Sequence, residues 1–212
     1  MRIRYFNSTE KWKAWWSKRK IDWRKDYLDS WNHPHRYLIT TILAKLNWLS
    51  LIEIGCGSGA NLMNITKNLQ GKQLGGMDVN PEAIALAKKT FMGGLFKVNS
   101  GDNMMLSDKS TDVVLSDMSL IYVHPKDIGR YIKEIKRVGR KYVVLCEFHS
   151  PSWWERFKLR AKDGYFAYDY KRLLLKYDFY DILLYQIPPE AWPDATKNQQ
   201  FRAIIVATIP KR

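Results

Sequence analysis

The stretch from Leu51 to Leu62 constrains this chain more than any other. It reads Leu-Ile-Glu-Ile-Gly-Cys-Gly-Ser-Gly-Ala-Asn-Leu, a short apolar run followed by three alternating glycines. The apolar run predicts a buried strand, and the glycines allow a sharp turn that a ligand can approach closely. The residues after the turn predict a helix whose first N–H groups face that ligand. We therefore expect a strand, a binding turn and a helix at this point.

Strand-like runs and helical patterns alternate along the rest of the chain. This alternation is typical of an open α/β sheet with helices on both faces, and the last two strands are expected to form a hairpin. Helices are predicted over residues 9–20, 35–47, 58–69, 83–91 and 127–138, and strands over 51–54, 73–79, 95–99, 112–117, 142–148, 177–187 and 201–209.

The length of 212 residues suits one well-buried domain with additions. We expect residues 1–37 to form a basic, aromatic helical cap, and residues 38–212 to form the domain, with a cover insertion at about 150–176. In the cap, the spacing of Trp12 and Trp16 places them on one helix face, with Lys13 opposite. A lid over a substrate, an interfacial anchor and plain packing all remain open for this segment.

The net charge of +14 is distributed unevenly. Residues 1–50 contain 11 Lys and Arg against 4 Asp and Glu, and residues 126–176 contain 14 against 6. The glycine-rich part, residues 51–125, contains 6 against 7. Basic flanks of this kind suit an anionic substrate, an anionic membrane surface or nucleic acid. Solvated helix faces that keep the protein in solution explain them equally well.

Cysteine usage and hydropathy indicate the cellular compartment in which the protein is expected. Cys56 and Cys146 both fall in apolar strand contexts without a paired spacing, which favours a reduced, cytoplasmic setting. No apolar run approaches the ~20 residues that span a bilayer, and the N-terminus lacks the apolar core of a signal peptide. His33 and His35 flank a proline, but no Cys or acidic cluster joins them, so no metal site is predicted.

The acid at the end of the first strand helps to choose between two cofactors. Gly55-x-Gly57-x-x-Ala60 satisfies the dinucleotide fingerprint of NAD(P)-binding folds. However, Glu53 followed by three alternating glycines resembles the first motif of class I S-adenosylmethionine-dependent methyltransferases. A carboxylate there suits the ammonium or hydroxyl groups of a ligand and is unexpected beside a pyrophosphate. The glycines alone leave both readings open.

Two further strand ends carry acids. Asp78 lies roughly 20 residues beyond the glycine turn, where a carboxylate can accept both hydroxyls of a ribose in either cofactor. The third predicted strand ends at Gly101-Asp102-Asn103. The resemblance implies that Asp102 accepts from the adenine amino group and that the backbone N–H of Asn103 reaches the ring. Gly-Asp-Asn is also good turn chemistry.

The resemblance implies a complete fold and cofactor site. It implies a seven-stranded, mostly parallel sheet in the order 3-2-1-4-5-7-6, with the last strand antiparallel and S-adenosylmethionine over the ends of the first three strands. The glycines would surround the methionine portion. The expected cofactor-binding residues are Glu53, Gly55, Cys56, Gly57, Gly59, Asp78, Val79, Asp102, Asn103 and Asp117.

The implied activity is methyl transfer to an O, N or C atom of a small molecule, which the basic flanks suggest is anionic. The sulfonium activates the methyl group, so positioning supplies much of the acceleration. Where a proton must be removed, the candidate groups are Tyr122, Glu147, His149 and His124. Tyr122 stands where many small-molecule members carry a histidine. An RNA methyltransferase or RNA-binding module, an NAD(P)-dependent oxidoreductase and peripheral membrane contact stay open, and the sequence fixes no oligomeric state.

Overall fold

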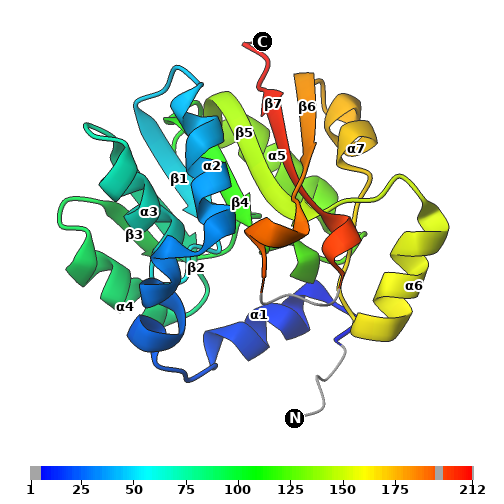
Figure 1. Ribbon diagram of the computed structural model, residues 1–212, viewed down its shortest axis with the longest axis horizontal. Coiled ribbons are helices and arrows are strands. Elements are labelled where there is room, and N and C mark those ends of the chain that lie inside the picture. Colours follow the sequence, from blue (N-terminus) through cyan, green and yellow to red (C-terminus); the bar gives the residue numbers. More distant parts are fainter. Residues whose placement is uncertain (1–5, 194–197, 212) are drawn as a thin grey trace.

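Seven strands form one sheet in the order β3-β2-β1-β4-β5-β7-β6, with helices on both faces (Figure 1). The computed structural model describes residues 6–193 and 198–211. The predicted strand order is confirmed. The strands are β1 (Ser50–Ile54), β2 (Gln73–Asp78), β3 (Leu95–Val98), β4 (Thr111–Asp117), β5 (Gly139–Phe148), β6 (Tyr180–Gln186) and β7 (Arg202–Thr208).

The helices begin close to where the sequence predicts them. In one example, Asn80 caps its helix by accepting from the backbone N–H groups of Glu82 and Ala83, and Pro81 occupies the first helical position. Short helical turns span Trp23–Tyr27 and Leu28–Asn32. The α-helices are α1 (Thr9–Ser17), α2 (Pro34–Ala44), α3 (Ala60–Asn68), α4 (Pro81–Thr90), α5 (Ile128–Val138), α6 (Trp153–Asp163) and α7 (Tyr170–Lys176).

Strand register brings the acidic strand ends together. β1 lies between β2 and β4 and is parallel to both, with Ile54 opposite Met77 on one side and Ser116 on the other. Asp78 and Asp117 each follow the residue opposite Ile54, so both lie at the edge where the glycine turn leaves the sheet. β7 runs antiparallel to both β5 and β6, which confirms the predicted hairpin.

Two apolar layers hold the sheet. On one face, α2 and α3 bury residues such as Leu43 and Ile65 against the sheet. On the other face, α5 and α7 bury Ile132 and Leu174. Figure 1 shows α2, α3 and α4 on the near side and α5 and α7 behind the sheet. No helix in the described part of the chain is both long enough and apolar enough to cross a membrane.

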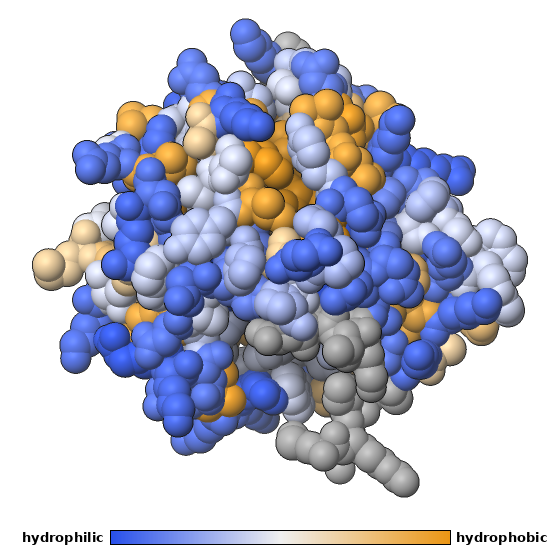
Figure 2. Space-filling model, in the orientation of Figure 1, coloured by the Kyte–Doolittle hydropathy of each residue, from blue (hydrophilic) through white to orange (hydrophobic). Residues whose placement is uncertain are grey.

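One end of the sheet is left uncovered on the α2 face. Leu183 and Tyr185 of β6 pair with Val206 and Ile204 of β7, and paired residues share a face of the sheet. The β7 side chains are buried, whereas Leu183 is 53% exposed and Tyr185 is 45% exposed. Figure 2 shows hydrophobic surface on this side, in the area between α2 and β6. The predicted cover at about 150–176 forms α6 and α7.

Candidate cofactor and acceptor site

The glycine turn is held against the end of β2. The N–H groups of Gly55 and Cys56 both donate to the carbonyl oxygen of Met77, at 2.7 and 3.0 Å. Gly57 has φ of +52°, and a Cβ atom there would come within 2.6 Å of the Tyr27 ring. This backbone conformation and this close approach both require glycine. The turn is therefore fixed in shape, with an aromatic ring directly above it.

Asp78 connects the end of β2 to the turn. Its carboxylate accepts from the N–H of Gly57 at 2.9 Å and from the N–H of Asn80 at 2.8 Å. Burial raises the pKa of Asp78, and these backbone donors oppose that rise. Val79 follows Asp78, and both residues line the main cavity of this edge. The carboxylate is thus placed at the cavity wall where the sequence predicts it.

The cavity has a volume of about 220 Å³ and lies between the strand ends and α1. The sheet side of its wall includes Gly55, Gly57 and Asp117. Trp12 and Trp16 of α1 form part of the opposite wall. Small-molecule sites commonly measure about 300–1,000 Å³. The volume of this cavity lies below that range.

Both ends of α1 are fastened to the domain. At the start, the Thr9 hydroxyl donates to the Asp127 carboxylate at 2.6 Å. At the end, the side-chain amide of Asn80 donates to the carbonyl oxygens of Trp16 and Arg19, at 2.8 and 2.9 Å. Figure 1 shows α1 lying below the sheet, across its lower edge. The helix therefore spans the carboxyl ends of the strands.

Lys13 faces the domain, although the helical pattern predicts it on the outer face of α1. Its ammonium binds both oxygens of Asp102, at 2.9 and 3.0 Å, and its side chain is only 21% exposed. Burial alone would raise the pKa of Asp102, but hydrogen bonds from Ser100 and Lys13 lower it. The expectation was wrong because helical periodicity does not show that an acidic partner, Asp102, lies within reach of the Lys13 side chain.

The loop after β3 contributes differently from the prediction. Ser100 and Gly101 line the cavity, whereas Asp102 lies beside it in its ion pair with Lys13. The N–H of Asn103 donates to the carbonyl oxygen of Ser100 at 3.2 Å. In this closed arrangement, neither Asp102 nor Asn103 is part of the cavity wall. Opening of α1 would release the carboxylate of Asp102.

Aromatic side chains form the outer wall. The Trp12 ring lies 4.7 Å from the Tyr122 ring, and the Trp16 ring lies 5.4 Å from it. Among the described residues, the indole N–H groups of Trp12, Trp16 and Trp23 are buried without a hydrogen-bond partner. Buried donors are nearly always satisfied. Three such donors around one cavity indicate that a ligand with oxygen acceptors completes it.

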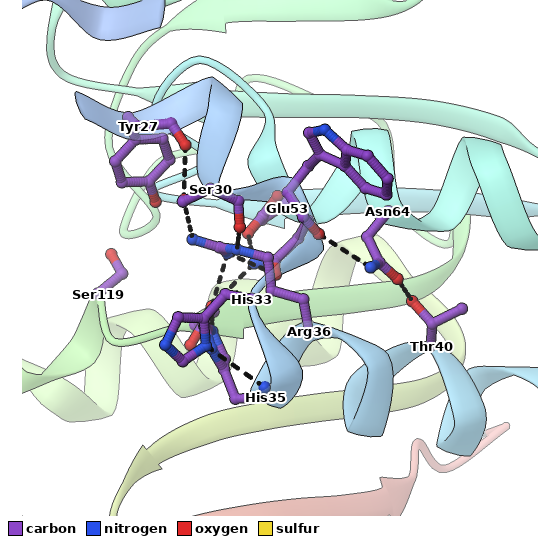
Figure 3. A network of polar contacts seen from close by, with 12 residues as sticks. Tyr27, Ser30, His33, His35, Arg36, Thr40, Glu53, Asn64 and Ser119 are labelled. Atoms are coloured by element: carbon purple, nitrogen blue, oxygen red, sulfur yellow. Dashed lines mark hydrogen bonds and ion pairs between the residues drawn. The ribbon is translucent and has the colours of Figure 1, made fainter. Parts of the chain in front are cut away.

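A buried polar network lies behind the turn (Figure 3). One oxygen of Asp117 contacts Nε2 of His35 at 3.0 Å, Nη1 of Arg36 at 3.2 Å and the side-chain amide of Asn61 at 2.9 Å. The same amide of Asn61 donates to Glu53 at 2.6 Å. The network therefore joins α2 and α3 to the ends of β1 and β4.

The pKa values of the two acids in this network are shifted in opposite directions. Burial raises the pKa of Glu53 to about 8, although the hydrogen bond from Asn61 opposes the rise. Burial alone would also raise the pKa of Asp117, but His35 and Arg36 hold it below its usual range. One carboxylate oxygen of each acid is buried without a partner among the described residues. Of the two acids, Asp117 also lines the cavity, so its free oxygen can accept a hydrogen bond from a ligand there.

Two of the candidate proton acceptors lie near the cavity. Tyr122 lines it, and burial raises the pKa of its phenol well above the usual range. Glu147 lies behind it and accepts from the Ser116 hydroxyl at 2.7 Å and from the N–H groups of Ser119 and Leu120, at 3.1 and 3.0 Å. Burial raises the pKa of Glu147 to about 8. Only Tyr122 can touch a ligand directly in this arrangement.

The two histidine candidates lie outside the cavity wall. The His124 backbone donates to the Thr9 hydroxyl at 2.9 Å, and its ring contacts Phe166. Nδ1 of His149 accepts from the N–H of Tyr170 at 3.2 Å. Of the predicted cofactor residues, Glu53, Cys56 and Gly59 also lie off the cavity wall. Glu53 and Cys56 are buried, and Gly59 caps α3.

Sequence reasoning missed the network around Asp117. Arg36 shares a helix face with Ile39 and Leu43, which are fully buried. That spacing indicates that Arg36 is buried too, and a buried arginine requires an acidic partner. In the described part of the chain, no group of three or more His, Cys, Asp or Glu residues is placed to hold a metal ion.

Residues 51–141 match the family model described as "Methyltransferase domain". Residues 51–141 are a methyltransferase domain. They include the glycine turn, Asp78, Asp102 and Asp117. The resemblance to S-adenosylmethionine-dependent methyltransferases seen in the sequence is confirmed over these residues.

Curated relatives of the methyltransferase domain are mycobacterial. The phthiotriol/phenolphthiotriol dimycocerosates methyltransferase of Mycobacterium tuberculosis (strain ATCC 25177 / H37Ra) is 32% identical over 111 residues, which cover 51% of this chain and 40% of the relative. The Mycobacterium leprae protein of the same name is 30% identical over 131 residues, which cover 58% and 47%. This chain thus spans less than half the length of these relatives.

Solved structures match almost the whole chain. Geranyl diphosphate C-methyltransferase from Streptomyces coelicolor A3(2), solved with Mg²⁺, geranyl diphosphate and S-adenosyl-L-homocysteine, has a TM-score of 0.70 at 12% identity and covers 99% of both chains. A chain from the complex between the Haloferax volcanii Trm112 methyltransferase activator and the putative methyltransferase has a TM-score of 0.67 at 16% identity, with 97% and 99% covered. At these identities the likeness shows the fold.

The residues present fit the cofactor of this domain class, S-adenosylmethionine. Glu53 and Asp117 each have a buried carboxylate oxygen that no described residue contacts, which suits an ammonium group. Asp78 stands at the cavity wall, where hydroxyls of a ribose can reach it. The site therefore offers acceptors for the amine and hydroxyl groups of the cofactor.

Proposed function

We propose that this chain transfers the methyl group of S-adenosylmethionine to an oxygen, nitrogen or carbon atom of a small molecule. The observation that carries the proposal is the cavity between the glycine turn and the aromatic wall of α1. The methyltransferase family match supports it independently. The division into a cap, residues 1–37, and a domain, residues 38–212, belongs to the same proposal, and cytoplasmic location stays a prediction.

The cofactor assignment distributes its groups over the strand ends. Gly55 and Gly57 would surround the methionine portion, with Glu53 accepting from its ammonium group. Asp78 would accept from the ribose hydroxyls. Asp102 and Asn103 would take the adenine once α1 has moved. Asp117 stays charged beside His35 and Arg36, and a bound ammonium group would favour the charged form of Glu53, whose pKa burial raises to about 8 without it.

The acceptor would lie against Trp12, Trp16 and Tyr122. These aromatic surfaces suit an apolar body, and Lys13 in the same cavity suits an anionic group. The Streptomyces neighbour was solved with geranyl diphosphate, which combines an apolar chain with an anionic head. We therefore propose an acceptor that is partly apolar and carries a negative charge.

The chain's own residues act chiefly by positioning. When bound, S-adenosylmethionine would supply an electrophilic methyl group to the acceptor. Trp12 and Trp16 would hold the acceptor and exclude water. The phenol of Tyr122 is neutral because burial raises its pKa, so it can orient a hydroxyl or amine by hydrogen bonding. Burial raises the pKa of Glu147 to about 8, so only above about that pH would its ionised carboxylate take up a released proton, through the Ser116 hydroxyl that it contacts.

A labelled-methyl transfer screen tests this function. The protein is incubated with S-adenosylmethionine labelled in the methyl group and with separate sets of hydroxylated small molecules, isoprenoid and sugar phosphates, lipids and RNA. The account expects label in a small molecule that combines apolar and anionic parts, and expects Asp78→Ala to abolish transfer. Transfer only to RNA would overturn the acceptor assignment, and cofactor binding by calorimetry without transfer to any class would overturn the enzymatic proposal.

A further inference from the structure

The outer face of α6 exposes three large aromatic side chains. Trp153 is 69% exposed, Trp154 is 47% exposed and Phe157 is 56% exposed. Their rings touch, with centroids 5.4 Å apart for the two tryptophans and 5.5 Å apart for Trp154 and Phe157. Single exposed apolar residues are ordinary on a protein surface, but a contiguous aromatic cluster marks an interaction site. We call these three residues the α6 aromatic cluster.

The cluster is not a misplaced core face, because α6 has a separate inner face. Leu159 is buried and belongs to an apolar cluster with Phe148 and Phe201. The hydroxyl of Ser150 donates to Glu155 at 2.5 Å, and Nη2 of Arg160 donates to the carbonyl oxygen of Phe6 at 2.9 Å. These contacts fix which side of α6 meets the domain. The α6 aromatic cluster therefore faces outward, because the opposite side of α6 already packs against the domain.

Positive charge surrounds the cluster. Lys158 and Lys162 of α6 are exposed, and the Lys158 ammonium lies 5.2 Å from the centre of the Trp154 ring. The two acidic side chains of the helix form hydrogen bonds within the protein: Glu155 accepts from Ser150, and Asp163 accepts from Asn198 at 3.1 Å. Residues 126–176 as a whole contain 14 Lys and Arg against 6 Asp and Glu. The complementary surface is therefore anionic.

We propose that the α6 aromatic cluster, together with Lys158 and Lys162, docks on the surface of an anionic lipid bilayer. Tryptophan rings settle at the headgroup level because they have an apolar body and a polar N–H, and lysines beside them bind lipid phosphates. Figure 1 shows α6 at the right-hand margin of the molecule, beyond the end of the sheet, where a flat surface can reach it. Proteins that bind single-stranded nucleic acid do so in a positively charged groove that follows the backbone, whereas α6 lies at the margin of the molecule.

Docking at α6 would place the acceptor cavity close to the lipid. The segment after α6 carries Tyr165, whose ring contacts both Trp12 and Tyr122 of the aromatic wall. Arg160 contacts Phe6, just before α1 begins. A lipid-like acceptor could then pass from the headgroup region to the wall of the cavity. The docking surface itself does not depend on the proposed methyl transfer.

Vesicle sedimentation without cofactor tests the proposal. The probe is phosphatidylcholine vesicles with about one third phosphatidylglycerol, compared with phosphatidylcholine alone. Wild type is expected to bind the anionic vesicles, and Trp153→Ala/Trp154→Ala/Phe157→Ala to lower the partition coefficient at least about tenfold. The matched control, Tyr180→Ala/Leu183→Ala/Tyr185→Ala, removes three other exposed side chains from β6 and is expected to leave binding unchanged.

A charge-reversed variant, Lys158→Glu/Lys162→Glu, is expected to lose the preference for anionic over neutral vesicles. Thermal unfolding confirms that each variant is folded. Wild type that does not sediment with the vesicles, or an aromatic triple variant that binds as well as wild type, overturns the proposal. It is also overturned if light scattering shows a dimer that the aromatic triple variant abolishes, or if an RNA oligonucleotide binds at α6 in place of vesicles. These results leave the methyl-transfer screen unaffected.

Discussion

Replacing Arg36 by methionine is expected to destabilise the protein strongly. The Arg36 side chain is 8% exposed and its guanidinium meets four acceptor atoms: Asp117 at 3.2 Å, Asn61 at 2.7 Å, and the carbonyl and hydroxyl oxygens of Ser30 at 3.0 and 3.1 Å. Methionine retains the apolar stem but leaves the Asp117 carboxylate buried without its permanent counter-charge. Breaking a buried ion pair in this way costs about 3–5 kcal/mol.

The cost depends on the charge of Asp117, which a double-mutant cycle can show. Asp117→Asn removes that charge, so Arg36→Met should cost less in the Asp117→Asn background than in wild type. For partners in one network the expected coupling is about 1–3 kcal/mol. The matched control is Lys136→Met, which breaks an ion pair of 2.8 Å with Asp178, a residue whose side chain is 77% exposed. Such a surface pair contributes less than about 1 kcal/mol.

Urea unfolding followed by circular dichroism measures these free energies of unfolding. The account expects Arg36→Met to lower the midpoint much more than Lys136→Met does, without a large change of slope. A loss below about 1 kcal/mol in Arg36→Met would refute the reasoning. So would a coupling near zero, since it would mean that solvent already screens Asp117 in the folded protein.

Three further perturbations test other parts of the site. Burial raises the pKa of Glu147 to about 8, so the folded state holds a proton that the unfolded chain loses above about pH 4. That contribution to stability is complete at low pH and falls by up to ~1.4 kcal/mol per unit as pH rises to about 8. Glu147→Gln should remove this share of the slope in unfolding titrations and leave the share of Glu53, whose pKa is also raised to about 8. Lys13→Met removes the ion pair with Asp102 and should speed hydrogen exchange of α1 about fivefold. An unchanged exchange rate would show that this ion pair does not hold α1 in place. Gly57→Ala meets the Tyr27 ring at positive φ and should lower the melting temperature by several degrees; an unchanged value would show that the turn is not fixed.

The sequence predicts the sheet well because its signals are local. Apolar runs and the Gly55 turn predict strand, turn and helix directly, and Asn80 with Pro81 predicts the start of α4. The register of β1 with β2 and β4 then follows from a parallel sheet, which brings Asp78 to the edge where the sequence places it. The strand order came from the family resemblance and not from any periodicity.

The polar contacts could not be predicted because their partners are far apart in the chain. Lys13 and Asp102 are separated by 89 positions, and Arg36 and Asp117 by 81. Helical periodicity says which side of α1 a lysine occupies, but not that an acid lies within reach of its long side chain. The burial of Glu147 behind Ser119 likewise depends on how the loop after β4 folds back, which no local pattern indicates.

Isothermal titration of S-adenosylhomocysteine into wild type and Asp78→Ala tests the central claim most directly. The claim is that acids at the strand ends hold the adenosine-bearing cofactor. The account predicts binding by wild type and a loss of at least about 100-fold in Asp78→Ala, because two hydrogen bonds to a charged carboxylate disappear. Circular dichroism must show that the variant is folded. Equal affinity in the two proteins, or binding of NADH in preference to S-adenosylhomocysteine by wild type, would contradict the account.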